Sequence, residues 1–294
     1  MDTLTPPTLQ DVCGQAVKLP TAPALLPQLI SVLNDSESGA DEIERIIQLD
    51  PALTATTLRL ANSAFFGAGE PVETVGEAVM KLGHREIYRL ASMALVNRWE
   101  SGSGTNAYGG DPGDFCRHAV CTALAAEVLA ERTGGIDPQT AYTAGLVCDM
   151  GKLAVAHACG PFFAAIRARQ ASEGCSWIQA ERDVLGYDHA QVGAQLLQSW
   201  RFPQGLVTAA EYISRPAEAP AESRRLLALL HAAKLLATSI GPGVADDGFL
   251  FVLDEGVLAE SGFTPEVLEA ALPEILDRSA KRLRDKLTHG KVTV

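Results

Sequence analysis

Residues 138–158 read PQTAYTAGLVCDMGKLAVAHA, and this stretch indicates the fold class. As in most of the chain, alanine and leucine are frequent, runs of β-branched residues are rare, and apolar residues recur every three or four positions. That spacing places apolar side chains on one face of an α-helix, whereas the side chains of a strand alternate between two faces. The sequence therefore predicts an all-α protein in which residues 138–158 form one helix and no sheet is expected.

A second predicted helix, residues 115–132, precedes this one and carries His118. Gly134 and Gly135 between the two predict a turn, so the helices pack as antiparallel neighbours and bring His118 close to Asp149. An imidazole and a carboxylate that face each other inside a bundle can bind a divalent metal, which lowers the pKa of a bound water for attack on a phosphoester. Two ligands are too few for such a site, so other residues must complete it.

The stretch SGSGTNAYGGDPGD, residues 101–114, divides the chain. It holds five glycines, one proline and almost no apolar residues, a composition that favours an exposed loop or a domain boundary. Residues 18–100 before it predict an N-terminal block of five helices, and residues 114–290 after it predict a helical bundle.

Several motifs resemble a single family in the order in which that family carries them. They are DPAL (50–53), LRLANSAFFG (58–67), AVMKLG (78–83), AGLVCDMGKL (144–153) and then Glu181, Gly186, Asp188-His189, Val192-Gly193, Leu197, Trp200 and Pro203. Over residues 18–240 the chain is thereby similar to the HD-related output domain (HDOD) family, a degenerate branch of the HD phosphohydrolase superfamily found in bacterial signalling proteins. The resemblance implies an HD-domain-like helical bundle over residues 114–290 with an N-terminal helical subdomain over residues 18–100.

By this resemblance, a working HD site takes a first histidine, a His-Asp pair, further histidines and a distal aspartate as metal ligands. The chain keeps His118 and Asp149. Cysteine replaces the histidine of the pair at Cys148, two later histidines are replaced at Glu211 and Tyr212, and lysine replaces the distal aspartate at Lys234. His231 lies one helical turn before Lys234, on the same face. We interpret these residues as a vestigial HD-site cavity, with no catalytic residue, no bound metal and no cofactor: His118, Cys148, Asp149, Glu211, Tyr212, His231 and Lys234.

Lysine at a ligand position changes the chemistry most, because an ammonium group does not bind metal and repels a divalent cation. We expect Lys234 to replace the missing metal by pairing with Asp149, since a buried carboxylate without a cation or hydrogen bonds costs several kcal/mol. In the alternative, Lys234 reaches solvent while backbone groups or water satisfy Asp149. A zinc site of His118, Cys148 and Asp149 is disfavoured, because adjacent helical residues point ~100° apart.

The 294-residue chain has a formal net charge of −12, from 36 acidic and 24 basic residues. Such a charge repels polyanions and argues against nucleic acid as a partner. The first ten residues resemble no secretory signal, and no apolar run approaches the ~20 residues that span a bilayer. We therefore expect a cytoplasmic protein without a membrane partner.

The resemblance and the incomplete ligand set together favour a non-catalytic output module that regulates a signalling pathway by binding another protein, such as a sensor or regulator. One alternative is a residual metal-dependent phosphohydrolase that uses His118, Asp149 and Cys148, or Glu211. Another is a module that senses a nucleotide or small anion, with Lys234, His231 and His118 supplying positive charge.

Overall fold

The structure, a computed structural model, describes residues 5–17, 26–33, 38–63, 66, 71–103, 105–200, 202–241 and 254–289. Every regular element within these ranges is helical, so the prediction of an all-α fold is confirmed. The α-helices are α1 (Leu9–Val17), α2 (Leu26–Leu33), α3 (Ala40–Gln48), α4 (Pro51–Ala61), α5 (Val75–Ser103), α6 (Asp114–Thr133), α7 (Pro138–Val147), α8 (Met150–Ala158), α9 (Phe163–Glu173), α10 (Trp177–Leu185), α11 (His189–Ser199), α12 (Gln204–Tyr212), α13 (Arg224–Ile240), α14 (Glu255–Glu260) and α15 (Pro265–His289). Single 3₁₀ turns are η2 (Thr105–Tyr108), η3 (Gly160–Phe162), η4 (Pro216–Glu218) and η5 (Ala221–Ser223).

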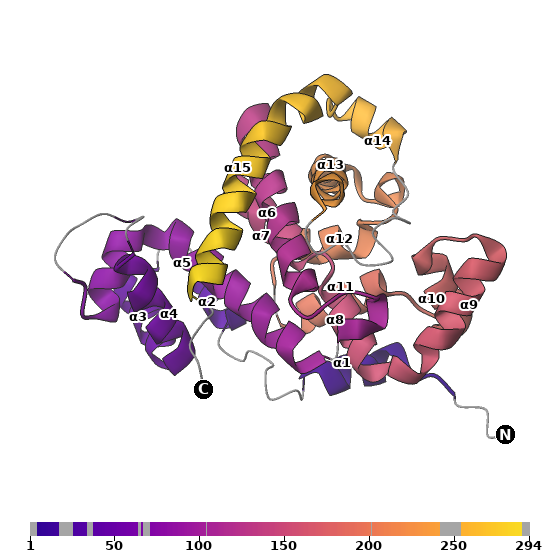
Figure 1. Cartoon of the computed structure of the whole chain (residues 1–294), viewed down its shortest axis with the longest axis horizontal. Coiled ribbons are helices and arrows are strands. Elements are labelled where there is room, and N and C mark those ends of the chain that lie inside the picture. Colours follow the sequence, from indigo (N-terminus) through magenta and orange to yellow (C-terminus); the bar gives the residue numbers. More distant parts are fainter. Residues whose placement is uncertain are drawn as a thin grey trace.

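Helices α2 to α5 pack on one another at one end of the molecule (Figure 1). α3 is amphipathic and buries Ile43, Ile46 and Ile47, because residues three and four apart share one face. The sequence predicts two helices separated by Gly83, and the structure confirms them: α5 consists of two helical segments that meet at a non-helical Gly83. The kink lies at Gly83, whose φ of 73° falls in the left-handed region that glycine adopts readily.

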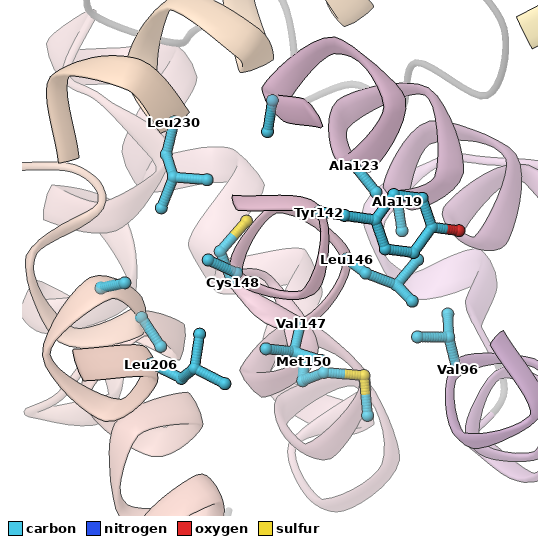
Figure 2. Close-up of a cluster of buried hydrophobic side chains, with 14 of the residues drawn as sticks. Val96, Ala119, Ala123, Tyr142, Leu146, Val147, Cys148, Met150, Leu206 and Leu230 are labelled. Atoms are coloured by element: carbon cyan, nitrogen blue, oxygen red, sulfur yellow. The ribbon is translucent and has the colours of Figure 1, made fainter. Parts of the chain in front are cut away.

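The remaining helices build the bundle around α6, which packs against α7, α13 and α15. Residues 119–130 of α6 are all buried, and most of them are alanine or other small apolar residues, which let neighbouring helices approach closely. Figure 2 shows Tyr142 and Leu146 of α7 lying beside Ala119 and Ala123 of α6 in this core.

The single helix expected over residues 138–158 is a wrong prediction. It is broken into α7 and α8, with Cys148 as the C-cap of α7 and Asp149 as the N-cap of α8. The Asp149 side chain makes no capping hydrogen bond to α8, because its carboxylate binds a side chain of another helix instead. Tertiary contacts therefore break a stretch that local helix propensity would continue.

Two helices were not expected at all. α1 packs against α8 and α11 of the bundle rather than against α2 to α5, and the Tyr187 hydroxyl donates a hydrogen bond to the Pro7 carbonyl at 2.8 Å. α14 is a short helix that packs on α13. The sequence also predicts a helix over residues 22–34, a turn at 34–36, a loop over 241–248 and a segment over 249–253 too short to classify. Residues 22–25, the turn, residues 242–248 of the loop and the whole of 249–253 lie outside the described residues.

The expectation of an exposed loop over residues 101–114 is also wrong in part. α5 continues through Ser103, η2 follows, and Tyr108 is only 6% exposed.

Within the described ranges, the structure contains no helix that is both long and apolar enough to cross a bilayer.

Candidate functional site

The centre of the candidate site is an ion pair between Lys234 of α13 and Asp149 at the α7–α8 junction. The Lys234 Nζ donates to both carboxylate oxygens of Asp149, at 2.9 Å each. Both residues are buried, so little water competes for either charge. The predicted pairing of these two residues is thus confirmed, and the alternative in which Lys234 reaches solvent is wrong.

A second lysine acts on the same carboxylate. Lys152, one turn into α8, lies with its Nζ 3.4 Å from Asp149 Oδ2 and is also buried. Burial alone would raise the pKa of Asp149, but the ammonium groups of Lys152 and Lys234, together with His189 and the Lys234 hydrogen bond, outweigh burial and hold that pKa well below the usual range. Asp149 is therefore ionised throughout the neutral range.

Cys148 lies beside this pair but faces apolar surroundings. Its Sγ donates to the Gly145 carbonyl at 3.3 Å, and the side chain lies in the cluster of buried residues drawn in Figure 2. Burial raises the pKa of the Cys148 thiol to about 12, and the negative charge of Asp149 adds to the effect. The thiol is consequently protonated at neutral pH, whereas a nucleophile or metal ligand has to be a thiolate.

His231 is fully buried on α13, where it joins two other segments. Its Nε2 accepts a hydrogen bond from the Asp254 backbone amide at 2.8 Å, and its Nδ1 lies 3.4 Å from the Ile213 carbonyl. A ring nitrogen that accepts from an amide carries no proton, so this pattern assigns a neutral imidazole with its proton on Nδ1. The expectation that His231 supplies positive charge is therefore wrong.

The other predicted site residues lie less deeply. His118 is part-exposed in the first half of α6, and Glu211 and Tyr212 are part-exposed in the last turn of α12. Arg215 lies over the Tyr212 ring, 5.1 Å from its centroid. The roles assigned to these three residues stay predictions.

The structure adds a buried polar group that sequence reasoning did not connect with the site. Glu181 of α10 is fully buried and accepts hydrogen bonds from the His189 backbone amide at 2.9 Å and from the Tyr108 hydroxyl at 2.7 Å. The Nδ1 of His189 lies 2.7 Å from the same carboxylate. The sequence predicts that Asp188 caps a helix starting at His189, and the structure confirms this, since Asp188 caps α11 through a capping box. The available signal was that Glu181, Asp188 and His189 all belong to the family motif.

The resemblance to HD phosphohydrolases implies a metal at this position, and the donor set does not fit one. An ammonium group binds both oxygens of Asp149, and the Cys148 thiol is protonated. His231 uses its Nε2 lone pair on a backbone amide. Across the ranges that the structure describes, no three His, Cys, Asp or Glu side chains group so as to hold a metal ion.

The chain is similar to known proteins in sequence and in fold. An uncharacterised protein of Treponema pallidum (strain Nichols) is 23% identical over 210 residues. The match covers 71% of this chain but only 40% of that relative's length. An HDOD domain protein of unknown function from Geobacter sulfurreducens matches with a TM-score of 0.73 and 23% identity, covering 97% of each chain. A protein of Shewanella amazonensis SB2B, provisionally described as a phosphohydrolase, matches with a TM-score of 0.64 and 26% identity, covering 92% of this chain and 98% of its own.

The model of the HDOD domain family matches residues 19–216, which contain Asp149, Glu181 and His189, while Lys234 lies beyond the match. With two thirds of its length matched in this way, the chain belongs to the HDOD family.

Proposed function

We propose that this protein is a non-catalytic regulatory module of a signalling pathway and acts by binding another protein. The observation that carries the proposal is the 2.9 Å contact of Lys234 Nζ with both oxygens of Asp149. Hydrolysis of the HD type needs that carboxylate as a ligand of a divalent cation, and a buried ammonium group at the same oxygens opposes the cation by charge and by volume.

The two alternatives receive less support. A residual phosphohydrolase needs a thiolate or a free carboxylate at positions 148 and 149, and neither is available at neutral pH. An anion sensor needs surplus positive charge. The buried ammonium groups of Lys152 and Lys234 instead both contact the Asp149 carboxylate, at 3.4 and 2.9 Å, and His231 is neutral.

A hydrolysis assay tests the non-catalytic part of the proposal. We expect no turnover of p-nitrophenyl phosphate or bis-p-nitrophenyl phosphate above background with Mg²⁺, Mn²⁺, Fe²⁺ or Zn²⁺. The Asp149→Asn variant is the matched control, because it keeps the shape of the side chain and removes its charge. Metal-dependent turnover by the wild type that Asp149→Asn abolishes would overturn the proposal.

Site-specific photo-crosslinking in the native host tests the partner. Met80 on α5 and Leu49 after α3 are 75% and 61% exposed, the two most exposed large apolar side chains of the described residues. Crosslinkers at these two positions should capture one and the same polypeptide, and a crosslinker at the exposed Ser172 of α9 serves as the control. Capture from none of these positions, or equally from Ser172, would contradict a specific protein partner on the N-terminal helices.

A further inference from the structure

Tyr108 is buried in a segment whose composition predicts exposure. It ends η2 directly after α5, and Gly109, Asp111 and Pro112, which follow it, are exposed. Only 6% of Tyr108 remains exposed. A large aromatic side chain that leaves a glycine-rich connection and enters the core anchors that connection.

The side chains of the socket that receives Tyr108 come from helices of the bundle. Its ring packs edge-on against Phe163, with centroids 4.9 Å apart, and lies 5.6 Å from the Trp177 ring. Its hydroxyl donates to the buried Glu181 at 2.7 Å. Arg167 donates to the carbonyl of the preceding residue, Ala107, at 2.7 Å, so side chain and backbone are both held.

The socket touches the ion-pair centre. The Nζ of Lys152, which also contacts Asp149, lies 5.9 Å from the centroid of the Tyr108 ring. His189 binds the same Glu181 carboxylate as Tyr108, and it helps to lower the pKa of Asp149. Tyr108 therefore lies between the end of α5 and the buried charges of the bundle.

On the other side, η2 continues directly from α5, the helix on which α2, α3 and α4 pack. α5 also contacts α6, α7 and α8 of the bundle. A change in how the N-terminal helices lie on the bundle therefore acts on η2 as well as on the contacts of α5 with α6, α7 and α8, because only one residue separates the end of α5 from the start of η2.

We propose that residues 105–113 form a releasable latch, in which Tyr108 is the bolt and Phe163, Arg167, Trp177 and Glu181 form the socket. With the bolt engaged, the end of α5 is fixed to the bundle. When Tyr108 leaves the socket, the end of α5 is no longer held at η2. Glu181 keeps its hydrogen bonds to His189, and the core of α6 and α7 stays folded. The latch gives the fold a local unit that opens while the rest of the bundle stays folded. It is argued from contacts alone and holds whether or not the proposed function is correct.

Hydrogen exchange measured by mass spectrometry on the whole chain tests the latch. Tyr108→Phe keeps the ring and removes the hydroxyl, so exchange at residues 105–113 and in the last turns of α5 should rise about fivefold, the effect of one lost hydrogen bond. Tyr108→Ala removes the bolt and should raise it by more than about tenfold. Exchange in α6 and α7 should stay as in the wild type, and Tyr212→Phe, a matched change outside the socket, should leave residues 105–113 unaltered.

Two outcomes with the Tyr108 variants overturn the proposal. One is unchanged exchange at residues 105–113 in Tyr108→Phe and Tyr108→Ala. The other is a rise of the same size in α6 and α7, which would make Tyr108 an ordinary part of a single cooperative core. Glu181→Gln approaches the same contact from the socket side, and an unchanged exchange rate at residues 105–113 in that variant would likewise count against the latch.

Discussion

Asp149 is 7% exposed, and both of its carboxylate oxygens bind the same ammonium group. Removing one partner of a buried ion pair leaves the other charge uncompensated, which costs about 3–5 kcal/mol, whereas replacing both partners by apolar residues is often neutral. Asp149→Leu should therefore lower the free energy of unfolding by about 3 kcal/mol, Lys234→Met by less because Lys152 still faces Asp149, and the double variant by less than the sum. Urea denaturation of the three variants and the wild type gives the coupling free energy.

The exposed pair of Lys281 and Asp277, whose side chains are 63% and 56% exposed at a distance of 2.7 Å, is the control for that cycle. Its coupling free energy should be about 0.5 kcal/mol or less. Additive effects of Asp149→Leu and Lys234→Met would show that the two residues do not act as a pair.

The same carboxylate makes stability depend on pH. Because folding lowers the pKa of Asp149, its contribution to stability is fully present above the ordinary aspartate pKa of about 3.9 and is lost as the pH falls below that value. The stability difference between the wild type and Asp149→Asn should be constant from about pH 7 to pH 5 and shrink towards pH 3. Urea melts at each pH measure it, and a difference that does not shrink would contradict a depressed pKa.

The Asp149–Lys234 pair could be predicted from the sequence, because a lysine at a ligand position leaves a buried carboxylate that needs a cation. The protonation state of His231 could not, because it depends on the backbone amide of Asp254, 23 residues away. The hydrogen bond between Tyr108 and Glu181 could not be predicted either, because nothing in a glycine-rich segment shows which side chain enters the core.

At the scale of helices, the crossing of α8 and α11 depends on Gly151. A Cβ built on Gly151 would overlap the His189 carbonyl oxygen and lie 2.9 Å from the Gly193 Cα, so the two backbones are in direct contact there. Gly151→Ala should lower the free energy of unfolding by about 3 kcal/mol or more, because backbone atoms have to move apart. Thermal or urea unfolding measures the loss.

Gly205 on α12 is the matched control, since a Cβ there meets nothing within 4 Å. Gly205→Ala should stabilise the protein by about 0.5–1 kcal/mol through helix propensity. If both substitutions had the same sign and size, the close approach at Gly151 would not limit packing.

Most helices could be predicted from periodicity and from caps such as Asp188, because those signals are local. The break at Cys148 and Asp149 could not be predicted from the sequence. It lies in a stretch of good helix formers, and it depends on a distant contact, because the Asp149 carboxylate binds Lys234 of α13. The docking of α1 on α8 and α11 is equally non-local, and proline-rich flanks hid the helix itself.

At the scale of the whole molecule, α5, α6 and α15 meet at one buried carboxylate. Glu127 of α6 has a fully buried side chain and pairs with Arg85 at 2.6 Å and with Arg89, both of α5, and with Arg278 of α15 at 3.3 Å. Figure 1 shows α15 passing alongside α6 towards the N-terminal helices. This carboxylate therefore joins α5 and the C-terminal helix α15 to α6 of the bundle.

Glu127→Gln should lower the free energy of unfolding by about 3 kcal/mol, because Arg85, Arg89 and Arg278 all lose the charge of the same buried carboxylate. Glu42→Gln, which breaks an exposed pair with Arg45, should change it by less than about 1 kcal/mol. Urea denaturation compares the two variants. Equal effects would mean that the buried junction contributes no more than a surface pair.

The central claim is that Lys234 holds the Asp149 carboxylate where a metal ion would otherwise bind. The measurement that tests it most directly is elemental analysis of the chain purified without chelator or metal-affinity resin, reported as metal per chain. Negligible zinc, iron and manganese is the predicted result. Metal close to one ion per chain, lost in the Asp149→Asn variant, would contradict the ion pair and restore a hydrolase at this site.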